Sequence, residues 1–216
     1  LEELVNEAQL LAGRGVRELI LIAQDLTLYG TDLYGRQMLP ELVRRLSEIE
    51  SLGWIRLHYL YPSDFPMEIL EMMQDNPKIC RYIDLPIQHI SDSVLRIMRR
   101  EHDSTSTRKL LYDIRRMVPD AAVRTTVIAG HPGETDKEFR ELLDFIGEYR
   151  FDRLGAFRYS HEENTHAALN YADTIPEKIK EKRVAKIMEL QQEISAARNA
   201  ALAGSVMRVI IDRREG

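Results

Sequence analysis

The chain has 216 residues, 44% of them hydrophobic and 30% charged, which is the composition of a globular protein with a sizeable core. No apolar run approaches the roughly 20 residues that a membrane-spanning helix needs. The formal net charge of -5 gives no general attraction for nucleic acid. The one cysteine, Cys80, excludes an internal disulfide framework and fits a reducing compartment. We expect a cytoplasmic protein that enters no membrane and does not bind nucleic acid directly, and we interpret clustered arginines such as Arg96, Arg99 and Arg100 as solvated faces.

Hydrophobic periodicity predicts helices and strands that alternate along the chain. Helices are expected at 1–12, 40–50, 67–73, 92–98, 106–117 and 136–149, and strands at 18–23, 54–61, 82–89, 121–128 and 152–159. Five such repeats require parallel strands joined by right-handed crossovers. Because no Gly-x-Gly-x-x-Gly motif follows a strand, the pattern favours a partial (β/α) TIM-like barrel over a dinucleotide-binding sheet.

The ends of the chain differ from the repeats. The sequence opens inside a helical pattern at Leu1, without a methionine, so we interpret it as part of a longer protein. Pro176 begins a long helix that is expected to end near Gly204, and Val206 to Ile211 alternate as a strand would. We predict a barrel domain over 1–203 and the beginning of a C-terminal β module over 204–216.

The stretch from Arg124 to Thr135 is the most informative unit of the chain. An apolar, β-branched strand runs into a turn with Gly130 and Gly133, and Thr135 then fits the N-cap of a helix with Glu138 as its capping-box partner. Such a turn lies on the carboxyl edge of a parallel sheet, where backbone N–H groups at the glycines could approach a ligand. An ordinary turn without a ligand explains the same spacing.

Polar residues follow every predicted strand, and in a barrel they would line one rim. This predicted rim consists of Gln24, Asp25, Asp64, Gln88, His89, Ser91, Arg124, Gly130, Tyr159 and Ser160. No His-x-x-x-His or His-Glu-x-x-His pattern predicts a zinc site, and no Gly-x-Ser-x-Gly motif predicts a serine hydrolase. Residue patterns alone therefore indicate a ligand-binding rim without naming its chemistry.

Short sequence motifs at the strand ends resemble those of a known family, and the resemblance covers nearly the whole chain. They are Ala23-Gln24-Asp25 with Tyr29-Gly30, Pro86-Ile87-Gln88-His89-Ile90-Ser91, Arg124-Thr125-Thr126, Gly130-His131-Pro132-Gly133-Glu134-Thr135 and Gly155-Ala156-Phe157-Arg158-Tyr159-Ser160. Together they resemble the radical S-adenosylmethionine (SAM) methylthiotransferases. Within that family they resemble the RimO type, which methylthiolates the β-carbon of an aspartate on a small-subunit ribosomal protein.

The resemblance implies cofactors and partners. It implies SAM and two [4Fe-4S] clusters in the full-length protein, the cluster loop following a first barrel strand, and a C-terminal TRAM domain that engages the substrate. It also implies an electron donor besides the ribosomal protein. Since Cys80 alone cannot hold a cluster, we expect the cluster cysteines upstream of Leu1, no metal ligands within this chain, and no activity for this fragment by itself.

The resemblance also suggests roles for strand-end side chains. Gln24 and Asp25 would contact the amino group of SAM, and Gln88 and Ser91 would lie near its ribose and carboxylate. The alternative for Gln24, Asp25 and Gln88 is that they satisfy backbone groups at the strand ends.

Three further positions complete the predicted site. Arg124 would pair with a carboxylate, either that of the methionyl group or that of the substrate aspartate, through its planar fork. Gly130 and Gly133 would let the backbone lie against adenine. The alternative for Arg124 is a structural ion pair.

The chain departs from the family pattern at His131, where an aromatic residue is common, and at His161 and Asn164, where Pro and Gly are common. Two other functions remain open. The sister enzymes that modify adenosine in tRNA usually read Gln-Ser-Gly-Ser in place of Gln88 to Ser91 and Ser-Thr-Asp in place of Arg124 to Thr126. A non-catalytic barrel that only binds a ribosomal partner is the second alternative.

Overall fold

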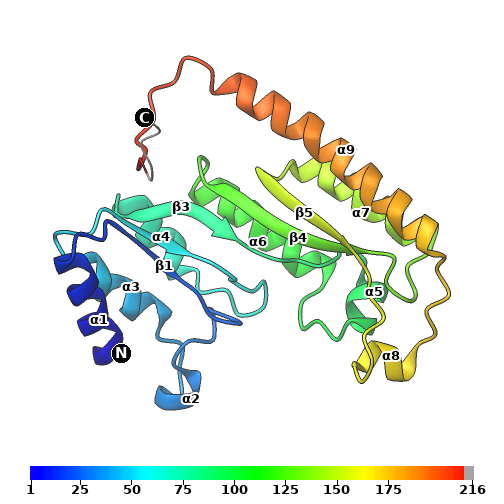
Figure 1. The fold of residues 1–216 in the computed structure, drawn as a ribbon, viewed down its shortest axis with the longest axis horizontal. Coiled ribbons are helices and arrows are strands. Elements are labelled where there is room, and N and C mark those ends of the chain that lie inside the picture. The colour runs from blue at the N-terminus through cyan, green and yellow to red at the C-terminus, as the bar shows by residue number, and fades with distance from the viewer. Residues whose placement is uncertain (212–216) are drawn as a thin grey trace.

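The computed structural model describes residues 1–211, which form one curved parallel sheet with helices on its convex side (Figure 1). The strands, in sheet order, are β1 Glu18–Leu21, β2 Trp54–Leu57, β3 Ile79–Asp84, β4 Ala122–Ala129 and β5 Arg153–Arg158. The helices are α1 Glu2–Gly13, α2 Thr31–Tyr34, α3 Leu39–Ser47, α4 Glu68–Asp75, α5 Asp92–Ile97, α6 Ser104–Met117, α7 Asp136–Tyr149, α8 His166–Asn170 and α9 Glu177–Ala201.

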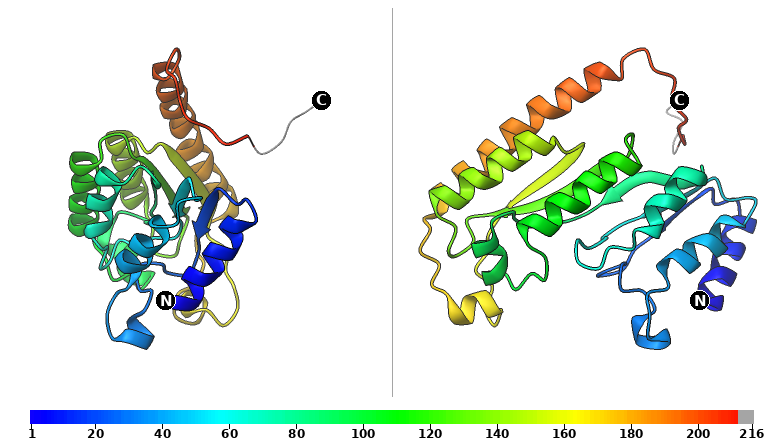
Figure 2. Two further views of the ribbon diagram at one scale, coloured as in Figure 1. Left: turned by 90° about the vertical axis from the view of Figure 1, so that its left-hand side faces the viewer. Right: turned by 180° about the vertical axis from the view of Figure 1, so that it is seen from behind.

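Sequential order of parallel strands is the arrangement of a (β/α) barrel, and five strands do not close one. The predicted partial barrel is therefore confirmed. Helices α4, α6 and α7 cover one face of the sheet, and the other face is open (Figure 2). Within residues 1–211, no helix combines the length and the apolar character that crossing a membrane requires.

Strand β4 shows how the sequence assigns the two faces. Its residues alternate between partly exposed and buried. Val123 and Val127 are buried under the helices, whereas Thr126 and Ile128 face the concave side. This period of two is the signature of a sheet with one covered face.

The segment after β3 continues beside β4 without being a regular strand. The N–H of Gln88 donates to the Thr126 carbonyl at 2.9 Å, and the N–H of Ile128 donates to the Gln88 carbonyl at 2.8 Å. Gln88 has a positive φ of 64°, and Pro86 lacks the N–H that a ladder needs. The predicted strand 82–89 is therefore wrong at its end, because these two residues interrupt it at Asp84.

The long predicted helix after Pro176 is confirmed as α9, which packs against β5 and α7 through residues that include Ile187 and Ile194. The predicted strand from Val206 to Ile211 is wrong, since these residues have no regular structure and are exposed. Residues 212–216 lie outside the described part, and the C-terminal module stays a prediction.

Helices α2 and α8 were missed because neither buries a residue and so neither shows an apolar period.

The capping box at the start of α7 is confirmed, with Thr135 Oγ1 accepting from the N–H of Lys137 at 3.2 Å and Glu138 accepting from the N–H of Thr135 at 3.0 Å. We predict that Thr135→Ala lowers the free energy of unfolding by about 1 kcal/mol. Thr105→Ala on α6 is the control, because Thr105 is exposed in the first turn of that helix. Urea unfolding measures both, and equal losses would contradict this role of Thr135.

Candidate functional site

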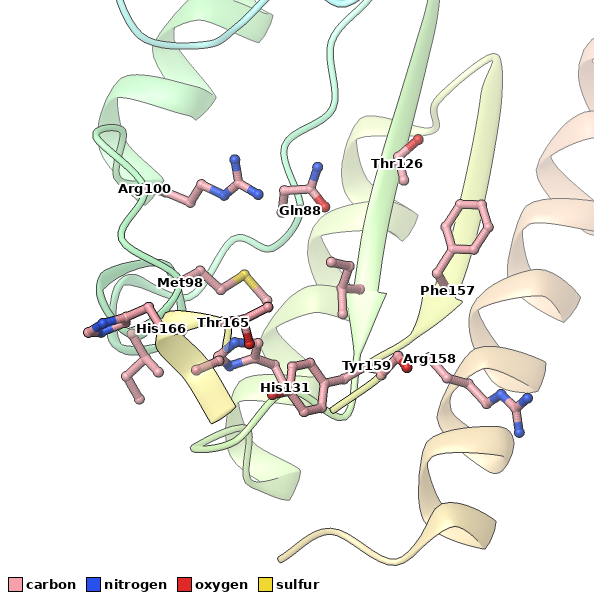
Figure 3. Close-up of a pocket in the computed structure, with 14 residues that line it drawn as sticks. Gln88, Met98, Arg100, Thr126, His131, Phe157, Arg158, Tyr159, Thr165 and His166 are labelled. Carbon is pink, nitrogen blue, oxygen red and sulfur yellow. The ribbon is translucent and has the colours of Figure 1, made fainter. Parts of the chain in front are cut away.

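The carboxyl ends of β4 and β5 and the segments after β3 border a pocket of about 470 Å³ (Figure 3). Pockets of this size that are mostly apolar, with a few polar groups, are typical of small-molecule and cofactor sites. Its lining consists of Gln88, Ile97, Met98, Arg100, Thr126, Ile128, His131, Phe157, Arg158, Tyr159, Ser160, Thr165, His166 and Ala167. Gln88, His131, Tyr159 and Ser160 were singled out from the sequence.

Gln88 is the predicted cofactor contact that the pocket contains. Its backbone is held in the left-handed conformation by the two hydrogen bonds to β4, which leaves the side-chain amide for the pocket. Figure 3 shows the guanidinium of Arg100 directed toward Gln88, whose amide lies at the far end of its side chain, on the side of Thr126. Both groups offer N–H donors, so the two side chains together can hold oxygen atoms of a ligand.

Arg100 is a charged pocket residue that sequence reasoning missed, since its cluster was interpreted as a solvated face. The end of α5 turns it inward: Arg99 has a φ of 56°, and the N–H of Arg100 donates to the Leu95 carbonyl at 2.9 Å. A left-handed residue followed by a hydrogen bond of this kind is the signature of a Schellman motif at the end of a helix. One Nη donates to the Tyr61 hydroxyl at 2.5 Å, while Nε is buried and has no partner among residues 1–211. Nothing in the sequence signals this motif, because arginine is unusual at its left-handed position.

His131 and Tyr159 form the floor of the pocket where β4 and β5 end. Their rings lie 4.8 Å apart in a T-shaped arrangement, and His131 Nδ1 lies 2.9 Å from the Pro132 carbonyl. Burial lowers the pKa of His131 below its ordinary value, and burial raises the pKa of Tyr159. Both residues are therefore neutral at pH 7 and serve as an aromatic surface.

The two glycines of the turn pack closely against neighbouring side chains. Both have a positive φ, 80° for Gly130 and 88° for Gly133. A Cβ on Gly130 would lie 2.4 Å from Cγ of Lys180, and one on Gly133 would lie 2.5 Å from Cδ1 of Ile97. The N–H of Gly130 already donates to Glu134 Oε2 at 2.8 Å. Each glycine thus closes a turn against a neighbouring side chain, and the contact of their backbone with adenine stays a prediction.

Gln24 and Asp25 follow β1, on the same edge of the sheet but across β2 and β3 from the pocket. Asp25 Oδ1 accepts from the N–H of Thr27 at 2.9 Å, and Gln24 is exposed. Asp25 thus has the structural role considered as the alternative. The pocket does not include either residue, and their contact with the amino group of SAM stays a prediction.

Ser91 is buried at the N-cap position of α5, but its hydroxyl makes no capping bond. Its N–H donates to His89 Nδ1 at 3.0 Å, and its Oγ lies 3.2 Å from Ser93 Oγ. Ser91 therefore shapes the segment that follows Gln88 and lies outside the pocket lining.

Arg124 lies beside Asp84, the last residue of β3, and at a lower level than the end of β4. It precedes Gly130 by six residues on β4, which corresponds to about 20 Å along a strand. Its Nη1 lies 3.4 Å from Oδ1 of Asp84, whose Oδ2 accepts from the N–H of Tyr59 at 3.1 Å. The ion pair considered as the alternative is therefore present, and the pairing of Arg124 with a carboxylate of SAM or of the substrate stays a prediction.

No cluster of three or more His, Cys, Asp or Glu side chains within residues 1–211 could hold a metal ion. Cys80 is a free thiol in β3 whose pKa is raised by burial.

We predict that Gly130→Ala lowers the free energy of unfolding by about 2–5 kcal/mol, because it combines a left-handed backbone with a collision against Lys180. Gly35→Ala is the matched control: Gly35 has a φ of 66°, and a Cβ there meets nothing within 4 Å. The control should lose only about 1–2 kcal/mol. Equal losses in chemical denaturation would show that the packing of Lys180 against Gly130 contributes nothing.

The depressed pKa of His131 predicts a loss of stability in acid. Above pH 6.5 the histidine is neutral in both states, but below it the unfolded chain binds a proton that folded His131 does not. His131→Phe removes this proton and keeps an aromatic ring against Tyr159. Urea unfolding of both proteins at pH 8 and pH 5 should therefore shift in favour of the variant at pH 5. The same difference at both pH values would contradict the assignment.

Comparison with known proteins identifies the fold and the family. The chain has the fold of coproporphyrinogen III oxidase (HemN) from Escherichia coli, described as a radical SAM enzyme, with a TM-score of 0.59 and 20% identity. That match covers 92% of this chain and 44% of the oxidase.

Two curated relatives are both named ribosomal protein uS12 methylthiotransferase RimO. The chain is 55% identical to that of Flavobacterium johnsoniae and 52% identical to that of Christiangramia forsetii, over 216 residues in each case. This is 100% of the chain but 49% and 48% of the relatives, so the chain spans about half of their length. The resemblance seen in the strand-end motifs is thereby confirmed. Residues 1–146 match the model of the radical SAM superfamily, and the chain belongs to that superfamily.

Proposed function

We propose that this chain is the SAM-binding core of an enzyme that adds a methylthio group to the β-carbon of an aspartate in ribosomal protein uS12. The observation that carries the proposal is sequence identity to relatives that bear that name. It is 49% or more in alignments that cover all 216 residues of this chain. A ribosomal substrate also favours a cytoplasmic location.

The pocket fits the adenosyl and methionyl parts of SAM. Its volume of about 470 Å³ suits a cofactor of this size. Ile128 and Phe157 offer apolar surface for adenine, and the Gln88 amide can bond ribose hydroxyls. The guanidinium of Arg100, which lines the pocket, can hold the methionyl carboxylate through its Nη groups.

When bound to a reduced cluster, SAM supplies a radical that can functionalise an unactivated carbon. The residues of this chain bind and orient it: the Arg100 guanidinium fixes the carboxylate, and the neutral ring of His131 keeps the floor of the pocket apolar. Cys80 cannot hold a cluster alone, so the two [4Fe-4S] clusters would use residues outside these 216. The electron donor and a C-terminal TRAM domain are likewise expected beyond this chain.

Two alternatives remain as outcomes of one experiment. The full-length protein is reconstituted with iron and sulfide without oxygen, supplied with SAM and a reductant, and offered uS12 and tRNA in separate reactions. A methylthio mass shift on the uS12 aspartate supports the proposal. Modification of tRNA alone would assign the chain to the sister enzymes, and binding of uS12 without modification would favour the non-catalytic barrel.

We predict that Arg100→Ala weakens SAM binding to the reconstituted full-length protein by about tenfold to a hundredfold, the usual loss when a charged group loses its hydrogen bonds. Arg96→Ala is the control, since Arg96 is exposed on the preceding helix α5. Equilibrium dialysis with labelled SAM measures both. A similar affinity for both variants would remove Arg100 from the site.

A further inference from the structure

The carboxylate of Glu134 is buried between the two segments that lead into the pocket. Its side chain is 0% exposed, and Oε2 accepts from the N–H of Gly130 at 2.8 Å. The same Oε2 lies 3.5 Å from Nε2 of His89, the residue after Gln88. Because His89 Nδ1 accepts from the N–H of Ser91, the neutral ring carries its proton on Nε2, facing the carboxylate.

The positive charge that balances Glu134 comes from helix α9. Arg183 is 6% exposed, and its Nη1 donates to Glu134 Oε1 at 2.8 Å and to the Glu134 carbonyl at 3.0 Å. Its Nη2 donates to Asp136 Oδ1 at 2.9 Å. One guanidinium thus holds the backbone and both carboxylates at the start of α7, which only a planar fork can do.

Lys180, one turn earlier on α9, strengthens the same junction. Its stem packs against Gly130, and its Nζ lies 2.5 Å from Asp173 Oδ2 and 3.5 Å from the Tyr159 carbonyl. Helix α9 therefore presents two buried cations to the ends of β4 and β5. Neither lines the pocket, but the turn and strand end that they hold carry His131 and Tyr159, which do.

We propose that Arg183 is a positioning residue for the cofactor pocket: through Glu134 it fixes the Gly130 turn and the His89 segment relative to each other, and so sets the affinity for SAM. This inference rests on the proposed function. Without Arg183, the buried carboxylate loses its charge partner and must move toward water or take up a proton. In either case the N–H of Gly130 loses its acceptor and the ring of His89 loses the carboxylate beside it, so the turn and the segment that carries Gln88 are held together less firmly.

The test uses the full-length reconstituted protein and two variants of α9. Arg183→Gln removes the charge at the junction. Arg198→Gln is the matched control, because Arg198 makes the same kind of contacts, to Asp152 Oδ1 at 2.7 Å and to the Arg150 carbonyl, near the end of α7 and away from the pocket. Thermal unfolding of both variants shows whether their losses of stability are comparable.

The first readout is amide hydrogen exchange without SAM. In Arg183→Gln, peptides covering 88–91 and 130–134 should exchange about tenfold or more faster than in the wild type. In Arg198→Gln they should not change. Equal exchange of these peptides in the two variants would overturn the proposal, whether or not the protein binds SAM.

The second readout is the affinity for SAM by equilibrium dialysis. Arg183→Gln should bind about tenfold to a hundredfold more weakly, and Arg198→Gln should match the wild type. Faster exchange without weaker binding would also overturn the proposal. If the wild type itself does not bind SAM, the proposed function fails, and hydrogen exchange alone decides the structural part of the inference.

A third variant covers the case in which Arg183→Gln does not fold. Arg183→Lys keeps the charge beside Glu134 but lacks the fork that also reaches Asp136 and the carbonyl. It should restore folding and show an exchange rate between those of the wild type and a protein without the junction. Exchange and affinity equal to the wild type in this variant would overturn the role of the fork.

Discussion

The desolvated carboxylate of Glu134 is the constraint on which the candidate site depends. A buried charge is tolerated only where donors surround it, and here they come from the β4–α7 turn and from α9, with the His89 ring beside them. The donors fix where the β4–α7 turn lies, where the segment after β3 ends and where α9 crosses the sheet. The pocket between these elements is a consequence of their being held together.

The concave face has two levels with different chemistry. At the carboxyl edge, the left-handed Gln88 and the inward-turned Arg100 place N–H donors beside apolar side chains. Further down, Arg124 is paired with Asp84, with His58 Nδ1 3.7 Å from the same carboxylate. The N–H donors of Gln88 and Arg100 at the upper level can bond a ligand. The charge of Arg124 at the lower level is already paired with that of Asp84.

Much of the architecture follows from local patterns. The strand β4, the capping box at Thr135 and the long helix α9 each depend on residues close in sequence, and each was predicted. The site was predicted less well, because it depends on contacts between distant residues. Glu134 and Arg183 are 49 residues apart, and no periodicity links them. The alternation of apolar and polar residues from Val206 to Ile211 led to a wrong prediction of a strand. No neighbouring strand within residues 1–211 pairs with this segment.

The account's central claim is that SAM binds where β3, β4 and β5 end. The most direct measurement is a structure of the full-length reconstituted protein with SAM bound, determined without oxygen. We expect adenosine against Ile128 and Phe157, with the methionyl carboxylate on Arg100. Density for SAM at another edge of the sheet, with this pocket filled by side chains or solvent, would contradict the account.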